Sequence, residues 1–101
     1  MEIQTISTDN ITKIKVVGRV DTLTSPDFQA QVEKLLQENP QNLEIDCSEL
    51  VFLSSAGLRA FFVLMKKAKA VGAEITLMSL TTTVREVFAV SGFDQFLNIV
   101  E

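Results

Sequence analysis

The chain has 101 residues, 47% of them hydrophobic, which is enough for one globular domain with a single core. With 9 basic and 13 acidic residues the net charge is −4, which would repel a phosphate backbone and argues against a nucleic-acid partner. There is no histidine and one cysteine, so His-dependent triads, Cys–His pairs, zinc sites and an internal disulfide are excluded.

We also expect a cytoplasmic protein that makes no use of a membrane. The longest apolar run, Ala60 to Met65, is too short to span a bilayer. The N-terminal residues are acidic and polar, unlike a signal peptide. No glycine-rich phosphate loop is present, and no pair of carboxylates lies in an evident apolar pocket. We therefore expect no enzyme activity, no metal and no cofactor.

Two strands are predicted at the start of the chain. The first covers Glu2 to Ser7 and alternates like a half-buried strand, with Ile3 and Ile6 facing inward. The second covers Ile11 to Val17 and stops at Gly18. The two strands are expected to form an antiparallel hairpin.

A first helix is predicted from Ser25-Pro26-Asp27, which have the order of an N-cap, a first-turn proline and a first-turn acid. Its buried stripe follows the helical period and comprises Phe28, Val32, Leu35 and Leu36. It ends near Asn39-Pro40, because a residue before proline resists the helical conformation.

A third strand buries Leu43, Ile45 and Cys47 on one face. Residues 48–52 are predicted to form a loop with Leu50 and Phe52 tucked beneath it. A second helix runs from about Ala56 to Val71 and is capped by Gly72. Its wide buried face comprises Leu58, Phe61, Phe62, Met65 and Ala68, and its outer face Arg59, Lys66 and Lys67.

The last elements are a strand from Glu74 to Met78, a helix opened by a Thr83–Glu86 capping box and ended by Gly92, and a strand-like segment from Asn98 to Val100. The order ββαβαβα predicts an α/β fold in which helices pack on a mixed four- to five-stranded sheet. Residues 1–101 are expected to form a single domain.

Ser54 and Ser55 are predicted at the start of the second helix, where free N–H groups and the positive end of the helix dipole converge. A phosphoryl group on Ser55 would gain from both, which suggests a reversible phosphorylation switch. Alternatively the two serines only cap the helix, because serine is a preferred N-cap residue. Position alone leaves both interpretations open.

Three segments carry a resemblance to a known family: G-R-V-D at Gly18–Asp21, D-C-S-E-L-V-F-L-S-S-A-G-L-R at Asp46–Arg59, and S-G-F at Ser91–Phe93. With them the chain resembles the anti-sigma factor antagonists, which are stand-alone STAS domains, over nearly its whole length. Its fold is expected to be of the STAS type.

Members of that family typically show D-S-[ST]-G-L at a switch, and the serine after the aspartate is phosphorylated. The matching run here is S-S-A-G-L at residues 54–58. The resemblance therefore assigns the phosphoacceptor position to Ser55. Ser54 replaces the aspartate, and Ala56 replaces the second hydroxyl residue.

The resemblance implies a partner switch. An unphosphorylated antagonist binds an anti-sigma serine kinase of the GHKL type, which then releases its sigma factor or other client. The kinase phosphorylates the antagonist, which then dissociates from it, and a PP2C-type phosphatase removes the phosphate. The antagonist itself is then a substrate and a ligand rather than a catalyst, and we expect it to be a monomer when free.

The predicted contact surface surrounds Ser55 and comprises Asp21, Thr22, Ser54, Ala56, Gly57 and, at its rim, Arg59. The resemblance places Asp21 in partner recognition, although it is equally interpreted as a turn aspartate. Gly57 would permit close approach of a partner or serve helix packing. Arg59 would pair with the phosphate or simply be a solvated helix residue.

Two other functions remain open. One is a constitutive STAS adaptor subunit of a transporter or signalling complex, in which Ser55 is never phosphorylated. The other is a small-molecule sensor or enzyme that uses a nucleotide near the same helix terminus, which the absence of histidine and of a glycine-rich loop disfavours.

Overall fold

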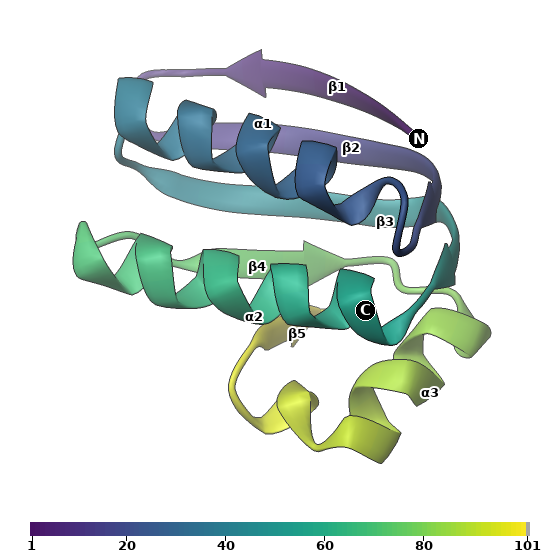
Figure 1. Ribbon diagram of the computed structural model, residues 1–101. Helices are drawn as coiled ribbons and strands as arrows, with labels where there is room; N and C mark the ends of the chain where they lie inside the picture. Colours follow the sequence, from purple (N-terminus) through teal and green to yellow (C-terminus); the bar gives the residue numbers. More distant parts are fainter. Residues whose placement is uncertain (101) are drawn as a thin grey trace.

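A computed structural model of the protein describes residues 1–100 and shows a sheet with helices packed on it (Figure 1). The elements are β1 (Glu2–Ser7), β2 (Ile11–Val20), α1 (Ser25–Glu38), β3 (Asn42–Leu53), α2 (Ser55–Ala70), β4 (Ile75–Met78), α3 (Thr82–Ser91), the 3-10 helix η1 (Phe93–Gln95) and β5 (Asn98–Val100). Their order confirms the predicted succession of strands and helices. Residue 101, the last of the predicted domain, lies outside the described residues.

The strands form one five-stranded sheet in the order β1-β2-β3-β4-β5. β1 pairs with β2 in the antiparallel direction, which confirms the predicted hairpin, and all other neighbours are parallel. One helix crosses over between each pair of neighbouring parallel strands. The carboxyl ends of β2 and β3 therefore lie at the same edge of the sheet, and the segments that enter α1 and α2 start side by side there.

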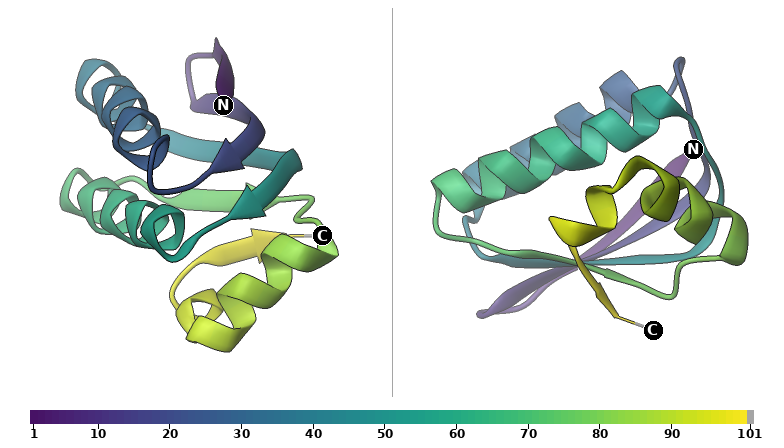
Figure 2. Two further views of the ribbon diagram at one scale, coloured as in Figure 1. Left: turned by 45° about the vertical axis from the view of Figure 1, so that its right-hand side comes forward. Right: turned by 90° about the horizontal axis from the view of Figure 1, so that it is seen from below.

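All three α-helices lie on one side of the sheet, and the other face carries no helix (Figure 2). A row of buried phenylalanines joins the helices to one another. Phe61 of α2 lies 4.9 Å from Phe28 of α1 and 5.6 Å from Phe88 of α3, measured between ring centroids. These contacts fix the positions of α1 and α3 relative to α2.

β2 is longer than predicted, because it passes through Gly18 and ends at Val20. Gly18 has a φ of 103°, a left-handed conformation that glycine adopts without strain, and the register with β3 shifts between Gly18 and Arg19. The prediction that the strand stops at this glycine was wrong, because the glycine forms a bulge and pairing resumes after it. Ile6 of β1 was also misplaced, because its side chain is 67% exposed.

β3 is longer as well, and the loop predicted over residues 48–52 is wrong. The strand continues to Leu53, and Leu50 and Leu53 are buried while Phe52 is 37% exposed rather than tucked in. Because the register between β3 and β2 shifts, the buried residues of β3 recur at every second position up to Cys47 and at every third position after it. The strand thus carries its core contacts to the start of α2.

Two helix starts differ from the prediction. α1 begins at Ser25 itself, and Thr24 occupies the N-cap position, with its hydroxyl donating to the Arg19 carbonyl instead of capping. α3 is capped by Thr81, whose side chain accepts a backbone N–H of the first turn at 3.3 Å. The predicted capping box at Thr83 is wrong, because this residue already lies inside the helix. No helix within residues 1–100 is long and apolar enough to cross a membrane.

Candidate functional site

The ends of β2 and β3 bring two of the predicted site residues together. Val20 and Leu53 are register partners, and the Val20 carbonyl accepts a hydrogen bond from the Ser54 N–H at 3.0 Å. Asp21 follows the first of these strands and Ser54 the second. Residues that are far apart in the sequence therefore meet at the carboxyl edge of the sheet, as the resemblance implied.

Ser54 is the N-cap of α2. Its Oγ accepts the Gly57 N–H at 3.2 Å, and its carbonyl accepts the Leu58 N–H at 2.9 Å. The first bond satisfies one of the N–H groups that a helix start leaves without a partner, and the second is the first backbone hydrogen bond of the helix. The capping interpretation is therefore confirmed for Ser54.

Ser55 is the first residue of α2, and its side chain is exposed. Within residues 1–100, its hydroxyl makes no hydrogen bond, and neither do the N–H groups of Ser55 and Ala56. The first turn of α2 contains no acidic residue. A negative group on the Ser55 oxygen would thus meet free N–H groups and the positive end of the helix dipole.

Gly57 lies where α2 approaches the sheet most closely. A Cβ at this position would lie 2.4 Å from the Val20 carbonyl oxygen and 2.7 Å from Leu53 Cδ1. Such distances leave no room for any side chain, and Gly57 is itself buried. We therefore assign Gly57 to helix packing and leave it out of the contact surface.

Asp21 organises the segment between β2 and α1. Its Oδ1 accepts the N–H groups of Leu23 at 3.0 Å and Thr24 at 3.1 Å, which is the pattern of a turn aspartate. The bond from the Thr24 N–H is the main reason why the pKa of Asp21 lies below its ordinary value of 3.8. The carboxylate stays ionised, and its Oδ2 lies 3.6 Å from Arg19 Nε. Thr22, next to it, is exposed.

Two grooves flank the start of α2. On one side, Ala56 and Arg59 line a groove of about 380 Å³ between α1 and α2, together with Pro26 and Gln29. Arg59 is exposed, lies one turn after Ser55, and makes no ion pair within residues 1–100. It is thus a free cation at the edge of the predicted surface.

On the other side, a groove of about 550 Å³ separates α2 from α3. Among its lining residues are Leu53, Ser55, Leu58, Glu86, Val87 and Val90. The sequence did not indicate this groove, because nothing in the local pattern shows that α3 packs beside the start of α2. Ser55 lies on its rim, which adds residues of α3 to the surroundings of the candidate phosphoacceptor.

A family model described as STAS domain matches residues 2–101. The chain belongs to the STAS domain family. One relative is BtrV of Bordetella bronchiseptica, assigned as an anti-sigma factor antagonist, which is 32% identical over 76 residues. The match covers 75% of this chain and 66% of BtrV, so the chain spans just under two thirds of the length of that relative. The anti-sigma-B factor antagonist of Staphylococcus epidermidis is 20% identical over 101 residues and is matched over 94% of its length.

Solved structures confirm the STAS fold. The anti-sigma factor antagonist SpoIIAA in its unphosphorylated form matches with a TM-score of 0.83 at 20% identity, over 99% of this chain and 89% of SpoIIAA. The phosphorylated form of this Bacillus protein matches with a TM-score of 0.74, again at 20% identity. The resemblance drawn from the sequence motifs is therefore confirmed at the level of family and fold.

The STAS domain has a further contact beside the start of α2 that the sequence did not indicate. The Arg19 guanidinium lies 4.2 Å above the centroid of the Phe52 ring. Arg19 and Phe52 are register partners in β2 and β3, just before Asp21 and Ser54. Their pairing depends on the register shift at Gly18, and no spacing rule applied to the sequence could have found it.

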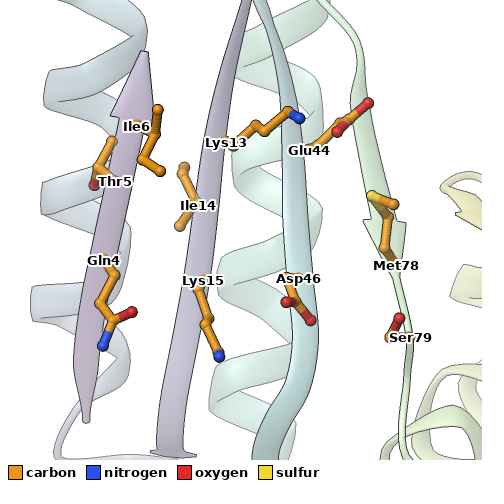
Figure 3. A pocket seen from close by; sticks show the side chains of 10 residues that line it. All are labelled: Gln4, Thr5, Ile6, Lys13, Ile14, Lys15, Glu44, Asp46, Met78 and Ser79. Atoms are coloured by element: carbon orange, nitrogen blue, oxygen red, sulfur yellow. The ribbon is translucent and has the colours of Figure 1, made fainter.

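The helix-free face of the STAS domain carries a depression of about 490 Å³ (Figure 3). Lys13 and Lys15 of β2 lie beside their register partners Glu44 and Asp46 of β3. Because opposite charges alternate, the face has no field of one sign that would select an ion. None of the predicted site residues lines it.

No group of three or more His, Cys, Asp or Glu side chains within residues 1–100 could hold a metal ion. Cys47 is fully buried, and burial raises the pKa of its thiol to about 12. Its burial confirms the prediction, and the thiol is a small apolar core group rather than a nucleophile.

Proposed function

We propose that this STAS domain is an anti-sigma factor antagonist that works as a phosphorylation-controlled partner switch, with Ser55 as the phosphoacceptor. The observation that supports this most directly is that the two serines have different roles at the start of α2. Ser54 caps α2, whereas the Ser55 hydroxyl is exposed and engaged in no hydrogen bond within residues 1–100. Ser55 can therefore be modified without loss of the helix cap.

The phosphorylated state is compatible with the fold. A phosphoryl group adds a charge of about −1.5 to −2 and three acceptor oxygens. On Ser55 these oxygens would lie beside free N–H groups, where a negative charge stabilises a helix by about 0.3–1 kcal/mol. Phosphorylation would therefore destabilise the complex with the partner but not the fold of the antagonist.

Release of the partner follows from desolvation. A partner that covers Ser55 would have to strip water from a dianion, which is unfavourable unless the partner offers matching charges. A loss of about 2.7 kcal/mol already weakens binding a hundredfold. A single phosphate placed in the contact surface is therefore sufficient to separate the two proteins.

The proposed partner of the unphosphorylated form is an anti-sigma serine kinase of the GHKL type, and a PP2C-type phosphatase restores Ser55. The chain itself performs no catalysis in this cycle. The proposed contact surface comprises Asp21, Thr22, Ser54, Ser55 and Ala56, with Arg59 at its rim. Arg59 is a candidate to hold the phosphate, because no acid within residues 1–100 pairs with it.

The test combines phosphopeptide mass spectrometry with binding. In cells that contain the kinase, we expect one phosphate, on Ser55, that is lost in Ser55→Ala and kept in Ser54→Ala. Ser55→Glu is expected to lose the kinase, and Ser55→Ala to retain it. If no phosphate is found under any growth condition and Ser55→Glu binds its partner like the wild type, the switch is refuted and the constitutive adaptor becomes the better interpretation.

A further inference from the structure

α3 presents two apolar stripes, and the second of them extends beyond the core contacts. Val84 and Phe88 are fully buried and face the core. Val87 and Val90 lie on a neighbouring stripe that lines the groove between α2 and α3. Val87 is half-buried and packs against the core, whereas Val90, one turn later, is 89% exposed. A helix with an apolar stripe beyond its core contacts is typical of an interaction surface.

The position of Val90 distinguishes it from ordinary exposed aliphatic residues, which need no explanation when they are scattered. Val90 and Leu23 are both 89% exposed, more than any other large hydrophobic residue within residues 1–100. Leu23 belongs to the turn held by Asp21, which starts beside Ser54, and Val90 shares a groove with Ser55. The two most exposed apolar side chains thus belong to the two segments that adjoin the start of α2.

The charge of the groove specifies what can enter it. Glu86 lies one helical turn before Val90 and is the charged residue among those that line the groove. No lysine or arginine lines it. The complementary ligand is therefore an apolar side chain with a basic residue next to it.

We propose that the groove between α2 and α3 binds an apolar side chain and an adjacent Lys or Arg of the anti-sigma kinase, with Val90 and Glu86 as the receiving residues. This inference rests on the proposed function. It also implies that phosphorylation would hinder binding in the groove. A phosphate on Ser55 would lie on the rim of the same groove and oppose the entry of an apolar group.

The experiment measures binding of the purified anti-sigma kinase, the one retained by the Ser55→Ala chain, by isothermal titration calorimetry. We expect Val90→Ser to weaken binding about tenfold, which corresponds to about 1.4 kcal/mol. Glu86→Lys should weaken it at least as much, and its effect should shrink as salt is added. Val71→Ser is the matched control, because Val71 is an exposed valine at the opposite end of α2. Thermal melts of all variants should coincide with that of the wild type.

The outcomes separate the two proposals. If Ser55→Glu abolishes binding while Val90→Ser and Glu86→Lys bind like the wild type, the groove is not used and the partner switch stands. If Ser55→Glu binds like the wild type while Val90→Ser and Glu86→Lys weaken binding, the switch is refuted and the groove is still a binding site. An equal loss in Val71→Ser and Val90→Ser would overturn the groove proposal as well, since the effect would not depend on the site.

Discussion

Replacing Gly57 by alanine tests the contact that holds the start of α2 against the sheet. In most helices this exchange is favourable, because alanine is preferred over glycine by about 0.8–1.0 kcal/mol. Here the added Cβ would lie 2.4 Å from the Val20 carbonyl oxygen and 2.7 Å from Leu53 Cδ1. The first of these neighbours is backbone, so it cannot swing aside as a side chain does.

The loss of stability in Gly57→Ala can be estimated from the displacement of α2 that the added Cβ requires. Overpacking of a close contact costs about 1–3 kcal/mol. To relieve it, α2 has to retreat from β2 and lengthen the 3.0 Å hydrogen bond between the Ser54 N–H and the Val20 carbonyl, a bond worth about 1 kcal/mol. The gain in helix propensity offsets only that last amount. We therefore expect Gly57→Ala to lower the free energy of unfolding by about 1–3 kcal/mol.

The assay is urea unfolding followed by far-UV circular dichroism, with the slope compared between variants to establish that both unfold in two states. The melting temperature should fall by about 4–8 °C for each kcal/mol lost. Ala89→Gly, at an exposed position of α3, is the control for propensity alone and should lose about 1 kcal/mol. If Gly57→Ala is as stable as the wild type or more so, α2 does not approach β2 as described, and the reasoning is refuted.

Three further predictions concern single side chains. Ser54→Ala should destabilise the fold by about 1 kcal/mol through loss of the α2 cap, whereas Ser54→Asp should unfold at the wild-type urea concentration, because aspartate caps equally well. Asp21 has a lowered pKa, so its contribution is present above the ordinary value of 3.8 and is lost as the pH falls through the folded-state pKa. Acid titration monitored by circular dichroism should therefore show a shallower loss of stability in Asp21→Asn. Cys47 should not react with a thiol reagent in the native protein and should react at once in guanidinium, since burial raises its pKa to about 12.

The helices were predictable from the sequence because their apolar residues follow the helical period without interruption. Phe28, Val32 and Leu36 are all buried along α1, and α2 lies within one residue of its predicted bounds. β3 was predicted too short because its inward residues change spacing, from Ile45 and Cys47 to Leu50 and Leu53. A strand is identified in a sequence by apolar residues at every second position. A shift in its pairing with a neighbouring strand changes that spacing, and nothing in the sequence indicates such a shift.

The candidate site was predictable in part for the same reason. A segment that ends a buried strand and opens a helix is a local feature, so the sequence placed both serines at the start of α2. Which serine caps depends on where the first helical turn closes, and only the structure assigns that role to Ser54. The groove beside Ser55 depends on how α3 packs on the sheet, a contact between residues about thirty positions apart that no short motif encodes.

The replacement of the family's aspartate by Ser54 alters the charge at the start of α2 but not its cap. Serine and aspartate are about equally good N-cap residues, so the exchange leaves the start of α2 in place and removes only a negative charge. That charge would have stood beside Ser55 on the surface, where it affects a partner more than the fold. Glu86 supplies an acidic group on the same groove as Ser55, but from α3. A kinase that acts on this chain would therefore meet the negative charge on the side of α3, and Ser54→Asp, which keeps the cap, should change kinase binding without changing stability.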